Sequence, residues 1–92
     1  MNENTIGILD VTSTVDEFKK CFQMSKNAIE DLGYRYTKTR GKVKRIDYSK
    51  RLVSWLTTFE GATTFLTAIT DDESYCKEWE TVMATLRERL ES

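Results

Sequence analysis

The side chains best suited to chemistry in this 92-residue chain are cations, and they are concentrated in one segment. Eight of the fourteen Lys and Arg residues fall between Tyr34 and Arg51, where only Asp47 opposes them. The flanking segments are acidic, with three basic and six acidic residues in 1–33 and three basic and eight acidic in 52–92. A net charge of −1 therefore hides one strongly basic segment, which can contact phosphates while the acidic regions stay clear of them. Nucleic acid is the first partner to consider.

The centre of the basic segment has the pattern of a short β-hairpin. Side chains alternate with a period of two from Tyr34 to Ile46, and Gly41 lies between the two halves. Like charges at cross-strand distance repel, so a hairpin that was merely solvated would not need many cations. We therefore expect this hairpin to present its cations to a partner. The cations around the glycine are Arg35, Lys38, Arg40, Lys42, Lys44 and Arg45.

Two short helices are expected before the hairpin. Thr14 and Glu17 are spaced as a capping box, and apolar residues at steps of three and four predict a helix that ends near Gln23. Ser25 is then expected to cap a second helix over 26–32. The two helices would be separated by about three residues, as in a helix-turn-helix.

Extended structure is expected over residues 1–13, as a short strand or a packed arm. After the hairpin, Asp47 or Ser49 can cap a third helix, and its continuation past Gly61 stays open because Gly and several Thr residues weaken a helix. The inward residues of that helix are expected to be Leu52, Val53, Leu56 and Phe59.

A last helix is expected after Thr70, which forms another capping box with Glu73. Its apolar stripe allows two interpretations: packing against the third helix, or pairing with the same stripe of a second chain to form a homodimer or larger oligomer. Pairing would double the phosphate contacts of a weakly binding domain. The stripe consists of Tyr75, Trp79, Val82, Leu86 and Leu90.

This order of elements predicts a mostly α fold with a small β-hairpin wing: a winged helix-turn-helix followed by a C-terminal helical hairpin. The segment TVDEFKKCFQMSKNAI, which begins at Thr14, resembles the opening of small phage and MerR-like winged helix-turn-helix proteins. The segment from Arg40 to Leu56 looks like the wing of that family and the helix after it. Two residues depart from the pattern, since Lys19 replaces a small Ala and Gln23 replaces the Gly of the turn.

The resemblance is nearest to the DNA-binding domain of lambda-like phage terminase small subunits, and it extends to excisionases. It covers about residues 12–58. The length of the chain suits a single domain over 1–92, with the winged part at 12–58 and a helical extension at 59–92 that could serve oligomerisation. The resemblance implies a double-stranded DNA-binding protein that selects sites for genome packaging, or alternatively an excisionase or transcription regulator. A larger packaging or recombination protein would then be a further partner.

The same resemblance implies which residues contact DNA. The start of the second helix would approach the major groove, the wing would grip the adjacent backbone, and the start of the third helix would add backbone contacts. These residues are Ser25, Lys26, Asn27, Arg35, Lys38, Arg40, Lys42, Lys44, Lys50 and Arg51.

Other classes of function have less support in the sequence. The chain has no His, no Gly-rich phosphate loop and no motif around Cys21 or Cys76, so we expect no enzyme, no cofactor and no metal site. No apolar run approaches the ~20 residues that span a bilayer, so we expect a cytoplasmic protein with no membrane contact. A small protein-interaction module, for instance an inhibitor of a host enzyme, is the alternative from another class.

Overall fold

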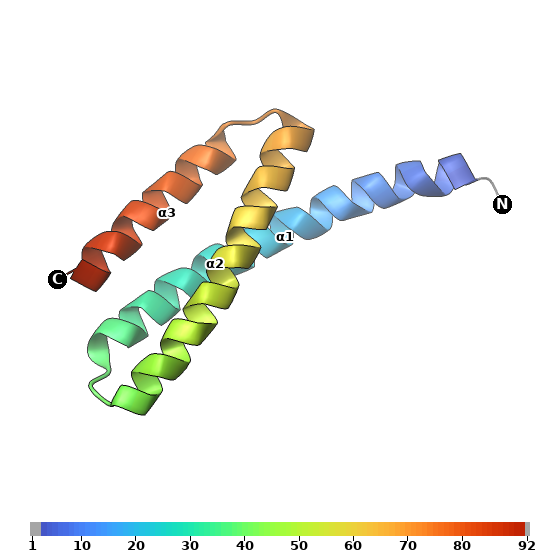
Figure 1. The fold of residues 1–92 in the computed structure, drawn as a ribbon. Helices are drawn as coiled ribbons and strands as arrows, with labels where there is room; N and C mark the ends of the chain where they lie inside the picture. Colours follow the sequence, from blue (N-terminus) through green and yellow to red (C-terminus); the bar gives the residue numbers. More distant parts are fainter. Residues whose placement is uncertain (1–2, 92) are drawn as a thin grey trace.

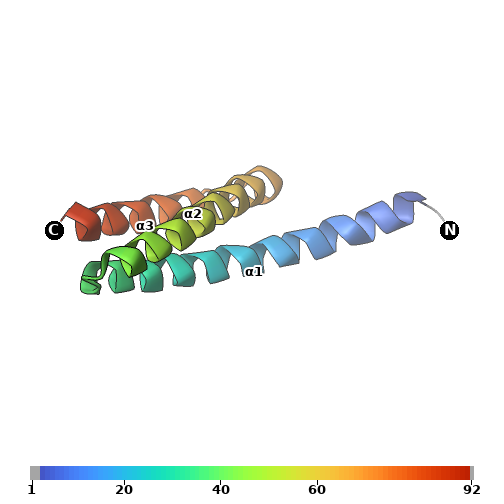
Figure 2. The same ribbon diagram turned by 60° about the horizontal axis from the view of Figure 1, so that its bottom comes forward.

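The computed structural model describes the backbone of residues 3–91 and the side chains of residues 14–91. This part of the chain consists of three α-helices: α1 (Glu3–Lys38), α2 (Lys42–Thr70) and α3 (Ser74–Glu91). In Figure 1, α2 runs back along the C-terminal part of α1, and α3 runs back beside α2. The N-terminal part of α1 projects past the other two helices, as the turned view in Figure 2 also shows.

A continuous apolar seam explains why α1 is a single helix. Side chains at alternating steps of three and four place one face of the helix against the rest of the molecule over three heptads. The side chains of Phe22, Ile29 and Leu32 are buried on this face. The seam residues are Val15, Phe18, Phe22, Ser25, Ile29 and Leu32.

The predicted helix-turn-helix is therefore wrong. Gln23 and Ser25 lie inside α1, and so does the supposed capping box at Thr14 and Glu17. No Gly or Pro occurs between Gly7 and Gly33 to interrupt the helix, and the seam passes through Ser25 without a change of register. The prediction of an extended segment over 1–13 is also wrong for the described residues, since α1 begins at Glu3.

The predicted β-hairpin wing is wrong as well, because the described residues contain no strand. Residues 34–38 complete α1, residues 42–46 begin α2, and a turn of only three residues joins them. The turn still falls around Gly41, which has extended backbone angles of φ −69° and ψ 123°. The alternation of side chains from Tyr34 onward wrongly indicated a strand. Tyr34 and Tyr36 lie on different sides of a helix, where one is exposed and the other half-buried.

The helix α2 continues past Gly61 to Thr70. Gly61 faces solvent, so the missing side chain costs no packing there. The predicted inward residues Leu52 and Phe59 are buried, but Val53 is 62% exposed and was placed wrongly. Further along the helix, Ala62 and Leu66 join the core, and they continue the same helical stripe.

The last helix begins where it was predicted, with a different cap. The Thr70 hydroxyl donates to the Leu66 carbonyl at 2.6 Å and so completes α2. The Asp72 carboxylate instead accepts a hydrogen bond from the Ser74 N–H at 2.9 Å, and this bond lowers the pKa of Asp72. Asp71 between the helices adopts the left-handed conformation, with φ 56°.

Aromatic contacts join the three helices at the centre of the core. Phe22 of α1 packs against Phe59 of α2 and Tyr75 of α3, with ring centroids 4.9 and 5.1 Å apart. Nearer the C-terminal end of α2, Phe65 stacks on Phe18 at 4.1 Å. Phe22 therefore contacts both other helices, and its burial couples the formation of all three.

Candidate nucleic-acid interface

The turn between α1 and α2 carries a group of cations that we call the basic end. None of its members forms an ion pair with a carboxylate among the described side chains. The group begins in the last turn of α1, crosses the three-residue turn and fills the first turn of α2. The basic end consists of Lys38, Arg40, Lys42, Lys44 and Arg45.

A shallow pocket of about 260 Å³ opens at the basic end. Arg40, Lys42 and Arg45 contribute its cationic lining, and Tyr36 and Ser49 lie beside them. The Arg45 guanidinium lies 4.5 Å from the centroid of the Tyr36 ring, so a residue of α1 orients a cation of α2. This arrangement suits a small anionic group such as a phosphate.

Ion pairs occur at both sides of the basic end, within single helices. The Arg35 Nε donates to Asp31 at 2.9 Å, and the Arg51 Nε lies 3.1 Å from Asp47. The bond to Asp31 raises the pKa of Arg35. Two of the predicted DNA-contacting arginines are thus already paired, whereas Lys50 is exposed and has no such partner among the described side chains.

The first turn of α2 has an electrostatic arrangement opposite to the usual one. Its N-cap is Gly41, which provides no side-chain hydrogen bond, and the turn contains no acidic residue. Lys42 and Lys44 instead lie where the helix dipole is positive, which destabilises an isolated helix by roughly 0.3–1 kcal/mol per cation. An anion bound at this turn would remove the conflict.

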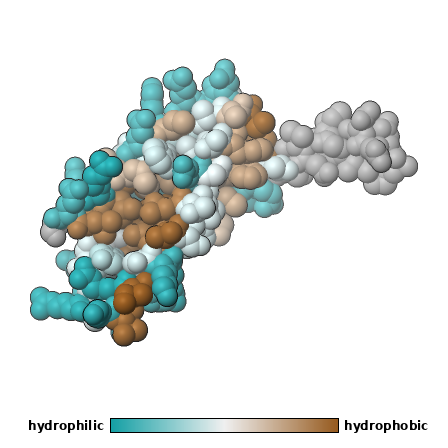
Figure 3. Space-filling view, viewed as in Figure 1, coloured by the Kyte–Doolittle hydropathy of each residue, from teal (hydrophilic) through white to brown (hydrophobic). Residues whose placement is uncertain are grey.

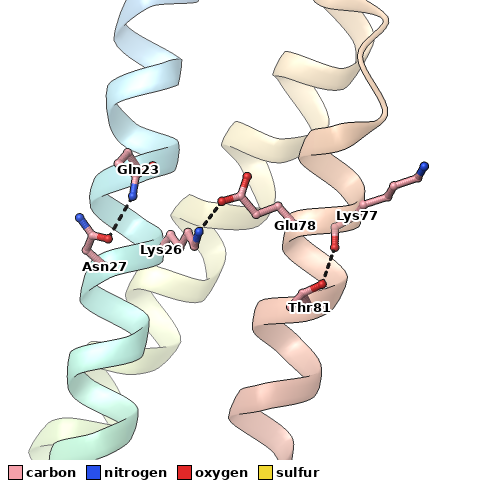
Figure 4. A network of polar contacts seen from close by, with 6 residues as sticks. All are labelled: Gln23, Lys26, Asn27, Lys77, Glu78 and Thr81. Atoms are coloured by element: carbon pink, nitrogen blue, oxygen red, sulfur yellow. Dashed lines mark hydrogen bonds and ion pairs between the residues drawn. The ribbon is translucent and has the colours of Figure 1, made fainter.

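The three residues predicted to begin a recognition helix lie elsewhere. They occupy the middle of α1, about 18 Å along the helix axis from its C-terminal end. Ser25 is fully buried, and Lys26 forms an ion pair with Glu78 of α3, which raises the pKa of Lys26 (Figure 4). Asn27 is exposed and accepts a hydrogen bond from the Gln23 side chain at 3.1 Å. The structure therefore does not bring these residues together with the basic end.

Tyr36 and Ser49 belong to the pocket although neither was predicted as a site residue. Arg45 was expected among the cations of the hairpin but not among the residues that contact DNA. The hairpin interpretation placed Arg45 and Lys42 on the two faces of a strand. Their separation of three residues instead places both on one side of a helix, and Ser49 continues that side. A helical interpretation of 42–49 would have found the set from the sequence.

The apolar stripe of the last helix is used largely within the chain. Val82 and Leu86 are buried in the core, and Tyr75 packs edge-on against Phe22. Trp79 is half-buried, whereas Leu90 is 44% exposed. Packing against the other helices therefore accounts for much of this stripe, and Leu90 at its end stays partly exposed.

The two ends of α2 have opposite charge. The basic end precedes it, while Asp71, Asp72 and Glu73 follow it, about 42 Å away along a helix of 29 residues. Such a separation orients the molecule in the field of a polyanion, with the acidic turn pointing away.

No helix among the described residues is long and apolar enough to cross a membrane. Nor do the described residues contain a cluster of three or more His, Cys, Asp or Glu side chains that could hold a metal ion. No family model, curated protein or solved structure shows a significant match to this chain.

Proposed function

We propose that this chain binds the phosphate backbone of double-stranded DNA through its basic end. The observation that carries the proposal is the group of five cations without carboxylate partners among the described side chains, arranged around the start of α2. Lys42 and Lys44 destabilise the helix that holds them, so their placement has no advantage for folding. Their placement is an advantage for binding, because a phosphate would interact with the cations and with the helix N-terminus at the same time.

The shape of the basic end favours backbone contacts over base contacts. Two packed helices with axes roughly 8–10 Å apart are wider, with their side chains, than a major groove of about 12 Å. The turn can therefore rest across phosphates without inserting a helix. We expect binding with little dependence on DNA sequence, since contacts to phosphates position a protein but do not specify bases.

The proposed contact with duplex DNA does not depend on a winged fold. Site selection for genome packaging, excision and transcription regulation were all expected from the winged fold, and the described residues contain neither wing nor recognition helix. Binding to duplex DNA depends only on the charges that the α1–α2 turn displays.

The test is duplex binding by fluorescence anisotropy at low salt with the double variant Lys42→Glu/Lys44→Glu. The wild type should bind, and the variant should bind roughly tenfold more weakly or worse, because two phosphate contacts become repulsive. The matched control is Lys19→Glu/Lys20→Glu, which makes the same change of charge at two exposed residues of α1. It should retain most of the affinity.

Thermal unfolding separates loss of binding from loss of fold. Glutamates in the first turn of α2 favour the helix dipole, so Lys42→Glu/Lys44→Glu should be more stable than the wild type by about 1 kcal/mol. An affinity that falls while stability rises supports the proposal. Absence of salt-sensitive duplex binding by the wild type would contradict it and favour the interaction module, with the basic end docked on an acidic protein.

A further inference from the structure

One side of α3, next to its core-facing stripe, carries a groove. Three of its lining residues, Trp79, Met83 and Leu86, also lie in the core or pack against it. The groove has a volume of about 580 Å³, and the residues that line it all belong to α3, between Trp79 and Glu91. Leu86 reaches it from the core side, and Met83 and Leu90 supply further apolar surface. In Figure 3 an apolar patch lies between the C-terminal part of α3 and α2, bordered by hydrophilic side chains.

The groove has the spacing of a helix-pairing surface. Glu80, Ala84 and Arg87 follow one another at steps of four and three, so they form one stripe beside Met83. Ala84 is exposed and lies near the middle of the groove, where its small side chain permits another helix to approach closely. The lining residues extend over about 18 Å, or three helical turns.

The charges on this stripe identify the helix that fits it. Glu80 and Arg87 are exposed and form no ion pair with another described side chain. In an antiparallel pair of α3 helices with a twofold axis between positions 83 and 84, each Glu80 faces Arg87 of the other copy, because 80 and 87 are equidistant from the axis. A parallel pair would instead place Glu80 against Glu80 and Arg87 against Arg87.

We infer that this chain forms a homodimer in which the groove-bearing sides of two α3 helices pack antiparallel. Three turns of helix bury less than the ~800 Å² per partner of a standard interface, so the dimer should be weak and its population should depend on protein concentration. Because α3 runs antiparallel to α2, the two basic ends would point in opposite directions from the dimer (Figure 1). The dimer itself does not depend on DNA binding and is measured without DNA.

Sedimentation velocity across a range of protein concentrations tests the dimer. The wild type should shift from monomer toward dimer as concentration rises. Glu80→Arg and Arg87→Glu should each remain monomeric, because either change places like charges opposite one another at both ends of the interface. Glu60→Arg, an exposed change on α2 with the same charge difference as Glu80→Arg, should dimerise as the wild type does.

Mixing the two single variants gives the decisive result. One chain then has Arg at positions 80 and 87 and the other has Glu at both, so every pair across the twofold is complementary again. A 1:1 mixture should therefore form heterodimers although each variant alone is monomeric. A wild type that stays monomeric at every concentration would overturn the inference, as would single variants that dimerise unchanged.

Discussion

Ser25 has the most informative environment of any single residue in α1. It lies in the apolar seam, it is fully buried, and its hydroxyl has no hydrogen-bond partner among the described residues. A buried hydroxyl without a partner destabilises a fold by roughly 1–3 kcal/mol. Its substitution therefore measures what this buried hydroxyl costs the fold.

Substituting Ser25→Ala should raise the free energy of unfolding by about 1 kcal/mol, because it removes an unsatisfied polar group and introduces a better helix former. Duplex DNA affinity should not change, since Ser25 lies far from the basic end. Chemical denaturation and anisotropy measure the two quantities on the same sample. A variant that is less stable than the wild type would contradict the conclusion that the Ser25 hydroxyl is an unsatisfied polar group in the core.

Asp72 should make stability depend on pH at the acid limit. The hydrogen bond from Ser74 lowers the pKa of Asp72 from its ordinary value of 3.8, so the charged form stabilises the folded state. That contribution is complete above about pH 4 and is lost as the pH falls through the lowered pKa.

The variant Asp72→Asn keeps an acceptor but cannot ionise. It should be less stable than the wild type near neutral pH, and the difference should shrink as the pH falls below about 4. Thermal melts over that range measure it. Asp71→Asn is the control, because the Asp71 side chain makes no hydrogen bond among the described residues. If both variants differed from the wild type in stability by the same pH-dependent amount, the cause would be net charge and not the hydrogen bond between Asp72 and Ser74.

At the scale of elements, a long apolar stripe in the sequence predicts a helix correctly. Local signals such as N-cap residues led to a wrong prediction of where α1 is interrupted. The last helix and the middle of α2 followed from their stripes, but α2 begins at Lys42 and not after a cap at Asp47 or Ser49. The break in α1 was inferred from Thr14 and Ser25, which are common N-caps but also occur inside helices. The step from Phe22 through Ser25 to Ile29 keeps the period, and that continuity outweighs one polar residue.

Two helical glycines provide the element-scale test. Gly61 faces open space, so Gly61→Ala should stabilise α2 by about 1 kcal/mol through helix propensity alone. A side chain at Gly33 would place its Cβ 2.9 Å from Cδ1 of Leu86, where α1 and α3 approach closely. Gly33→Ala should therefore increase the free energy of unfolding by less than Gly61→Ala does, because Leu86 must move within the core.

Denaturant titration of both variants gives the comparison. The expected order of stability is Gly61→Ala above both Gly33→Ala and the wild type. Equal stabilisation by the two substitutions would show that Leu86 adjusts without cost and that α3 is loosely packed on α1. A loss of stability in Gly61→Ala would contradict a continuous α2.

For the whole molecule, composition predicted the location of charge but not the element that displays it. The basic segment and the acidic flanks are visible in the sequence, and the turn at Gly41 was placed correctly. Two tyrosines of this region, Tyr36 and Tyr48, are half-buried by contacts between elements, the first beside Arg45 of α2 and the second against the core. Contacts between the helices accompany the helical structure of this segment, and the alternation of side chains along the sequence could not predict them.

Salt dependence tests the whole charge distribution at once. Each phosphate contact releases counterions and contributes about −0.9 to the slope of log affinity against log salt concentration. With five cations at the basic end and no insertion into a groove, the slope for duplex DNA should lie between about −3 and −5. Lys42→Glu/Lys44→Glu should reduce its magnitude by about 2, whereas Lys19→Glu/Lys20→Glu should leave it unchanged. Anisotropy titrations at several NaCl concentrations, on duplexes of different sequence, measure both quantities. A slope near zero, or a strong preference for one duplex, would mean that the contact surface is not the cationic turn, since phosphate contacts alone carry a salt slope and no base discrimination.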